Sequence, residues 1–211
     1  MSHNLENIDS IIFDLDGTLW DATKEIANSW SSILSKYNTS KKEITEDELK
    51  QYMGLTLDEI GKRIFPDMKQ NEVDKLIKEC CQFENKHLTG NGATLYDKLE
   101  DTLKELSKKY KLFIVSNCQD GYIEAFLEFN DFHKYFKDFE CPGRSNLLKA
   151  ENIELIIKRN NLTNPIYVGD THMDSEAAKK AGIPFVFASY GFGNTNEYIS
   201  KIEKFEDLLN L

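Results

Sequence analysis

A short apolar run that ends in two carboxylates, at residues 11–19, constrains this fold more than any other feature of the chain. Residues 11–13 are branched or aromatic without a polar interruption, a pattern typical of a strand buried on both faces. Asp14 and Asp16 follow directly, and then Gly17 and Thr18. Because side chains alternate along an extended chain, we expect both carboxylates to project toward the same side.

Two carboxylates this close together repel each other unless a cation or a shared proton lies between them. Gly17 lets the chain turn sharply just after them. The alternative is a strand that merely ends in a polar Asp-Gly turn, a common turn pair. The rest of the chain decides between these two interpretations.

From residue 95 onward, helical patterns alternate with short apolar strands. The sequence predicts strands at 111–115, 165–168 and 183–188, an extended piece at 139–141, and helices at 95–110, 120–129, 149–160, 173–181 and 198–209. Such alternation indicates right-handed βαβ units. We therefore predict an α/β fold with a parallel sheet.

Residues 20–91 show helical periodicity and no convincing strand. Amphipathic patterns predict helices near 26–37, 45–52, 56–65 and 71–87, and Thr45 with Glu48 forms a capping-box pattern. We expect this block to be a small all-helical domain inserted after the first strand. Residues 1–19 and 92–211 would then form the α/β core domain.

Composition limits the classes of function. A net charge of −10 provides no basic surface for nucleic acid, and no apolar run approaches the roughly 20 residues of a membrane span. The first ten residues are polar, so no secretory signal is expected. Four cysteines without CxxC spacing favour reduced thiols in the cytoplasm.

Each predicted strand of the core ends in a polar cluster. Asp14-x-Asp16 follows the first strand, Ser116-Asn117 the second, and Gly169-Asp170-x-x-x-Asp174 the third, while Lys149 opens a helix after a loop. The carboxyl ends of parallel strands meet at one edge of a sheet, where ligands bind. The sequence therefore predicts one acidic, metal-binding pocket, because an ordinary turn does not explain a polar cluster at every strand end.

These residues resemble the haloacid dehalogenase superfamily, and within it the phosphoglycolate-phosphatase-like branch. The resemblance rests on four ordered motifs: DxDGT at 14–18, SN at 116–117, Lys149, and GDxxxD at 169–174. It covers essentially the whole chain, and it implies a Rossmann-like three-layer α/β/α core with a helical cap at 20–91. Two features of the branch are absent: Lys149 is followed by Ala150 in place of the common Lys-Pro pair, and no Tyr-Pro-Gly occurs around Tyr96.

The resemblance also implies catalytic roles. Asp14 would be the nucleophile that forms an aspartyl-phosphate, since a carboxylate is ionised at neutral pH. Asp16 would be the general acid for the leaving alkoxide and then the general base for water. Ser116 and Asn117 would bind phosphoryl oxygens, and Lys149 would neutralise charge on the phosphoryl group and on Asp14.

The metal site implied by the resemblance is made of oxygen ligands. It comprises Asp14, the main-chain carbonyl of Asp16, Asp170, and Asp174 either directly or through a water. Such ligands suit octahedral Mg²⁺, which keeps several waters and binds phosphate. We therefore expect Mg²⁺ as the cofactor.

The resulting prediction is a Mg²⁺-dependent phosphatase of a small phosphorylated metabolite, monomeric or homodimeric. A phosphomutase of the β-phosphoglucomutase type is the nearest alternative, and a non-catalytic cation-binding protein is another. By analogy with the family's cap loop, leaving-group selection is expected near Tyr52, Met53, Gly54 and Arg63. Roles for Arg144 and His172 are left open.

Overall fold

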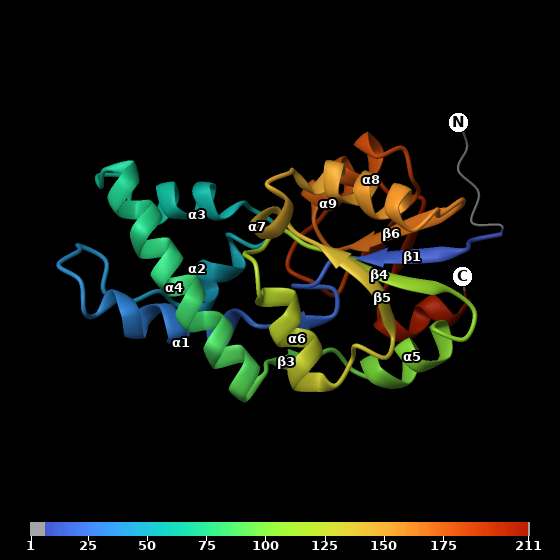
Figure 1. The fold of residues 1–211 in the computed structure, drawn as a ribbon, viewed down its shortest axis with the longest axis horizontal. Helices are drawn as coiled ribbons and strands as arrows, with labels where there is room; N and C mark the ends of the chain where they lie inside the picture. The colour runs from blue at the N-terminus through green and yellow to red at the C-terminus, as the bar shows by residue number, and fades with distance from the viewer. Residues whose placement is uncertain (1–6, 211) are drawn as a thin grey trace.

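The computed structural model describes residues 7–210, which form a six-stranded parallel sheet flanked by helices (Figure 1). Residues 1–6, which belong to the polar N-terminal stretch, lie outside the described residues, and so does residue 211. The strand order is β5-β4-β1-β6-β7-β8 and every neighbouring pair is parallel. The strands are β1 Ser10–Phe13, β4 Lys111–Val115, β5 Phe136–Glu140, β6 Pro165–Gly169, β7 Phe185–Ala188 and β8 Ser200–Ile202.

Side-chain alternation on β1 divides the core into two layers of apolar contacts. Ile12 packs with side chains of α8 (Lys149–Arg159) and α9 (His172–Lys180). Ile11 and Phe13 face the opposite side, among side chains of α5 (Leu99–Leu106), α6 (Tyr122–Asn130) and the 3₁₀ helix η1 (Phe205–Asn210). Figure 1 shows α8 and α9 on one face of the sheet and α5 on the other. The predicted three-layer α/β/α core is therefore confirmed.

Four helices occupy residues 23–91 and pack against one another beyond the edge of the sheet (Figure 1). They are α1 Thr23–Leu34, α2 Glu46–Lys50, α3 Leu57–Ile64 and α4 Gln70–Asn91. Capping boxes begin α2, at Thr45 and Glu48, and α3, at Thr56 and Glu59. No helix within residues 7–210 is long and apolar enough to cross a bilayer. We propose the division already expected, a cap at 20–91 and a core at 1–19 and 92–211.

The two chain connections to these helices form a short ribbon that the sequence did not predict. β2 (Trp20–Asp21) pairs antiparallel with β3 (Thr94–Leu95), so the expectation of no strand within 20–91 is wrong. Strands of two residues are too short to produce a periodic pattern. Helix α4 also continues past the predicted end at 87, and it stops at Gly92, whose φ is +65°.

The end of the chain differs from the helix predicted at 198–209. Residues 200–202 instead form β8, which pairs with β7, and only residues 205–210 are helical, as η1. Ile202, Phe205 and Leu208 are all buried. Their spacing of three fits a helical face, which explains the wrong prediction, but Ile202 is buried as the last residue of an edge strand.

Candidate active site

Five of the predicted site residues line one cavity at the carboxyl edge of the sheet, and the other two, Asp170 and Asp174, lie next to them. The cavity has a volume of about 50 Å³ and lies between this edge and helices α1–α4. The sheet side contributes Asp14, Asp16, Ser116, Asn117 and Lys149. Ser116 is buried and Asn117 half-buried, and the Asn117 Nδ2 donates a hydrogen bond to the Gly54 carbonyl across the cavity mouth, at 3.0 Å.

Lys149, the first residue of α8, is held between two carboxylates. Its Nζ donates to Asp14 Oδ1 at 2.8 Å and to Asp174 Oδ1 at 2.6 Å, and all three side chains are at least 95% buried. Burial raises the pKa of Asp14 to about 6, although the Lys149 ammonium opposes this. Burial alone would lower the pKa of Lys149, but the two carboxylates outweigh it and raise that pKa well above its usual value.

Asp170 has one carboxylate oxygen held by backbone and one without a partner. Oδ2 accepts hydrogen bonds from the backbone N–H groups of Phe192, at 2.7 Å, and Gly193, at 3.3 Å. Oδ1 is buried and has no hydrogen-bond partner among residues 7–210. Because burial and the nearby Asp174 and Asp14 disfavour its charge, the pKa of Asp170 lies well above its ordinary value. An unpartnered buried carboxylate oxygen is costly unless a cation completes it.

The carboxylates of Asp14, Asp170 and Asp174 each place an oxygen within 4.8 Å of the other two. This oxygen-only group, together with the unpartnered oxygen of Asp170, fits a hard divalent cation such as Mg²⁺. In Asp174, both carboxylate oxygens already accept hydrogen bonds, Oδ1 from Lys149 and Oδ2 from Thr171. Its Oδ2 accepts from the backbone N–H of Thr171, at 2.9 Å, and from its hydroxyl, at 2.6 Å, as the capping box of α9.

Glycines allow the loops to approach Asp170 this closely. Gly17 has φ of +80°, and a Cβ there would lie 2.3 Å from Asp170 Oδ2. A Cβ on Gly191 would lie 2.3 Å from the Cβ of Asp170. The segment from Gly191 to Gly193 was not singled out from the sequence, where only its repeated glycine could have drawn notice.

Asp16 lines the cavity but its carboxylate lies outside the group of three. Its Oδ1 accepts hydrogen bonds from the indole Nε1 of Trp20, at 2.9 Å, and from the hydroxyl of Tyr122, at 2.7 Å. Burial raises the pKa of Asp16 to about 8, since it outweighs the hydrogen bond from Tyr122, which lowers it. At neutral pH this side chain is therefore mostly a neutral carboxylic acid.

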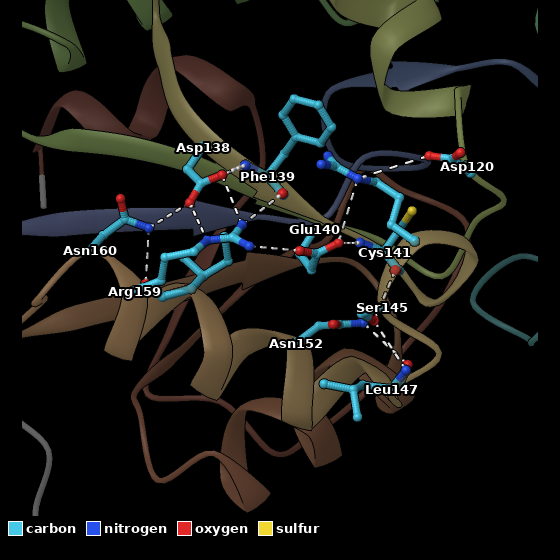
Figure 2. A network of polar contacts seen from close by, with 12 residues as sticks. Asp120, Asp138, Phe139, Glu140, Cys141, Ser145, Leu147, Asn152, Arg159 and Asn160 are labelled. Atoms are coloured by element: carbon cyan, nitrogen blue, oxygen red, sulfur yellow. Dashed lines mark hydrogen bonds and ion pairs between the residues drawn. The ribbon is translucent and has the colours of Figure 1, made fainter.

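Arg144 is held by a network of polar contacts outside the cavity. Its guanidinium is within 3.8 Å of the carboxylate of Glu140 and 3.9 Å of Asp120, and it stacks on the Phe139 ring. Figure 2 shows this network, in which Arg159 binds Glu140 from the other side at 2.9 Å. These contacts stabilise the end of β5, and Arg144 is not among the residues that line the cavity.

His172 is exposed at the start of α9 and is not among the residues that line the cavity. Of the four cap residues named from the sequence, Tyr52, Met53 and Gly54 line the cavity, whereas Arg63 is exposed on α3. Trp30 of α1 and Glu84 of α4 also line it, and neither was singled out from the sequence. Both positions fit the buried face of an amphipathic helix, which does not distinguish packing from binding.

Comparison with known proteins adds to this geometry. Residues 11–188 match the family described as haloacid dehalogenase-like hydrolase. The phosphoglycolate phosphatase of Aquifex aeolicus is 28% identical over 198 residues, 90% of this chain and 88% of its own length. The pyrophosphatase PpaX of Anoxybacillus flavithermus is 27% identical over 221 residues, 97% of each chain.

The fold has solved counterparts as well. A haloacid dehalogenase-like family hydrolase from Streptococcus pneumoniae superposes with a TM-score of 0.79 at 22% identity, covering 96% of this chain and 97% of that one. This likeness concerns the fold, while the family match spans most of the chain, including all four motifs. The chain therefore belongs to the haloacid dehalogenase-like hydrolases.

Proposed function

We propose that this hydrolase is a Mg²⁺-dependent phosphatase that cleaves a small phosphate monoester through an aspartyl-phosphate on Asp14. The observation that carries the proposal is the buried, unpartnered Oδ1 of Asp170 beside the carboxylates of Asp14 and Asp174. The names of the relatives, phosphoglycolate phosphatase and pyrophosphatase, support a phosphoryl substrate.

Asp14 would attack the phosphorus in line with the leaving alkoxide. Lys149, which already contacts Asp14, would stay beside it and balance negative charge on the transferring group. Ser116 and Asn117 line the same cavity and would donate hydrogen bonds to phosphoryl oxygens. Mg²⁺, held by Asp14, Asp170 and the main-chain carbonyl of Asp16, with Asp174 direct or through a water, would neutralise further charge.

Asp16 suits the role of general acid and base. It faces the cavity, and its raised pKa keeps a proton available for the leaving alkoxide. The hydrogen bonds from Trp20 and Tyr122 to one oxygen fix the orientation of the carboxyl group. After proton transfer, the carboxylate would accept a proton from the water that hydrolyses the aspartyl-phosphate.

The test is phosphate release from a panel of small phosphate monoesters and one aryl phosphate, with Mg²⁺ and with chelator. We expect metal-dependent release by the wild type and a loss of at least about 10³-fold in Asp14→Asn. Asp67→Asn, which alters an exposed aspartate far from the cavity lining, is the matched control. Undiminished release by Asp14→Asn would contradict the nucleophile assignment.

A second measurement separates the alternatives. With a substrate whose phosphoryl group is labelled, rapid acid quench should trap labelled wild-type protein. Hydroxylamine should release the label, as expected for an acyl phosphate. A phosphomutase would instead transfer the label to a second hydroxyl and yield a bisphosphate, and a cation-binding protein would bind Mg²⁺ without labelling. The cytoplasmic location and the monomeric or homodimeric state remain predictions.

A further inference from the structure

Helix α4 contributes to the cavity one carboxylate that has no role in the proposed reaction. Glu84 is 3% exposed and lines the same cavity as Asp14 and Asp16. The other cavity-lining residues of the helical segment are apolar or aromatic, apart from Gly54: Ile26, Trp30, Leu49, Tyr52, Met53, Leu55, Leu57 and Ile60. Within the described residues, Glu84 is thus the one charged group that this segment presents to a bound molecule.

Glu84 is oriented by two donors and has no cationic partner. The indole Nε1 of Trp30 donates to Oε2, and the amide of Gln119 donates to Oε1 at 2.8 Å. Among the described residues, its hydrogen-bond partners are these two neutral donors and include no lysine or arginine. A carboxylate offers about four acceptor positions, so both oxygens retain capacity for a further donor. Glu84 can therefore accept a hydrogen bond from a ligand without losing either donor.

The charges around the cavity indicate what that ligand carries. Its lining contains the acidic side chains of Asp14 and Glu84, the mostly neutral Asp16, and one cationic side chain, Lys149. Lys149 is already committed to Asp14 and Asp174. A leaving group with a positive charge would therefore be attracted, and a leaving group with a carboxylate would be repelled by Glu84.

The shape and the aromatic lining support the same class of ligand. A volume of about 50 Å³, compared with roughly 10–15 Å³ for one water measured in the same way, leaves no room for a bulky leaving group. Trp30, Tyr52 and Tyr122 line the cavity together with Glu84. Aromatic side chains beside a buried acid are a setting in which proteins bind alkylammonium ions.

We propose that Glu84 determines specificity by binding an ammonium group on the leaving alcohol, so that the substrate is the phosphate monoester of a small amino alcohol. This inference rests on the proposed phosphatase function and identifies its substrate class. It also separates this chain from relatives named phosphoglycolate phosphatase, whose named substrate carries a carboxylate at that end.

The test compares three two-carbon substrates that differ only at the far end: ethanolamine phosphate, ethylene glycol monophosphate and phosphoglycolate. With Mg²⁺, wild-type kcat/KM should favour the ammonium over the carboxylate by about 100-fold or more. Glu84→Gln should narrow that ratio by about tenfold or more, mainly through KM. Glu72→Gln, an exposed position on the same helix, should leave the ratio unchanged.

The outcomes separate failure of the inference from failure of the phosphatase proposal. Preference for phosphoglycolate, or a ratio unaffected by Glu84→Gln, overturns the assignment of Glu84 while hydrolysis dependent on Asp14 still stands. Hydrolysis of an aryl phosphate but of none of the three substrates likewise overturns the substrate class.

A binding measurement decides the inference without turnover. In Asp14→Asn with Mg²⁺, ethanolamine phosphate should raise the unfolding temperature more than phosphoglycolate does. That difference should disappear in the double variant with Glu84→Gln. Equal shifts with both ligands in the single variant would overturn the inference even if no phosphate is released from any compound.

Discussion

The ammonium of Lys149 lies 2.8 Å from a carboxylate oxygen of Asp14, although 135 residues separate the two in the chain. Asp14 follows β1 at the centre of the sheet, and Lys149 begins α8 on one face of it. Both side chains are almost completely buried. Folding therefore brings the proposed nucleophile and the side chain that balances its charge together from segments far apart in the sequence.

Removal of Lys149 should destabilise the metal-free protein. In Lys149→Met, Asp14 and Asp174 remain buried without a cation, and loss of one partner of a buried pair costs about 3–5 kcal/mol. We expect this drop in the free energy of unfolding by urea denaturation with chelator, and a smaller drop with Mg²⁺. Lys179→Met, which removes the exposed ion pairs of an α9 lysine with Glu176 and Glu197, is the control and should change stability little. A similar loss in both variants would contradict the coupling.

Asp170→Asn should remove the stabilisation that Mg²⁺ gives the wild type. At about 100 times its dissociation constant, a ligand specific for the folded state adds about 2.7 kcal/mol. The carboxamide oxygen can still accept from Phe192 and Gly193, and the variant is neutral where burial disfavours charge. Without metal the variant should thus be at least as stable as the wild type. Thermal unfolding with Mg²⁺ and with chelator measures both effects, and an unchanged Mg²⁺ shift would exclude Asp170 as a ligand.

Gly17→Ala and Gly182→Ala form a matched pair that separates backbone strain from steric contact. Both glycines have positive φ, +80° and +72°, but a Cβ at 182 meets nothing within 4 Å, whereas one at 17 meets the Asp170 carboxylate. Gly182→Ala should cost about 1 kcal/mol and leave Mg²⁺ binding intact. Gly17→Ala should also displace Asp170 and weaken Mg²⁺ binding. Calorimetric titration with Mg²⁺ tests this, and equal affinity in the two variants would contradict it.

Glu84 should make the stability of the metal-free protein depend on pH. Burial raises its pKa from the ordinary 4.5 to about 7, although the hydrogen bonds from Gln119 and Trp30 oppose this. Between these values the folded state binds more protons than the unfolded state. The free energy of unfolding therefore falls as pH rises through this window, and the loss is complete above about pH 7.

Glu84→Gln should abolish this contribution. As pH rises from about 5 to about 8, the wild type loses up to about 3 kcal/mol of unfolding free energy through Glu84. The variant should not show this loss, so its stability relative to the wild type should rise by the same amount. Asp16, Cys80, Cys81 and Tyr122 lie nearby in both proteins. Because the charge of Glu84 also raises the pKa of Asp16, the difference between the two pH profiles includes a smaller contribution from Asp16. Urea denaturation at the two pH values gives the measurement. Parallel pH profiles for the two proteins would show that Glu84 does not titrate in this range.

The sequence was most informative about the central strands and about the side chains at their carboxyl ends, because a single physical rule determines where each lies. Apolar runs gave the central strands β1, β4 and β6, and the parallel arrangement places their carboxyl ends together. The carboxylates of Asp14, Asp170 and Asp174 accordingly lie close together, and Lys149 at the start of α8 contacts Asp14.

Features that depend on tertiary contact were missed. Glu84 sits on the buried face of a helix that reads as an ordinary amphipathic pattern, and only the placement of α4 over the sheet edge brings it into the cavity. Asp16 turns toward Trp20 and Tyr122, partners 4 and 106 residues away, which strand alternation alone does not specify. The last segment pairs as an edge strand, although its spacing of apolar residues suits a helix.

The central place of β1 also affects how the protein is made on the ribosome. Its two neighbours, β4 and β6, begin only at Lys111 and Pro165, so after its translation β1 has no strand partner in the main sheet for about a hundred residues. The helices of residues 23–91, which depend on local contacts, can form during that interval. An apolar strand that waits this long is a natural target for a chaperone that binds nascent chains.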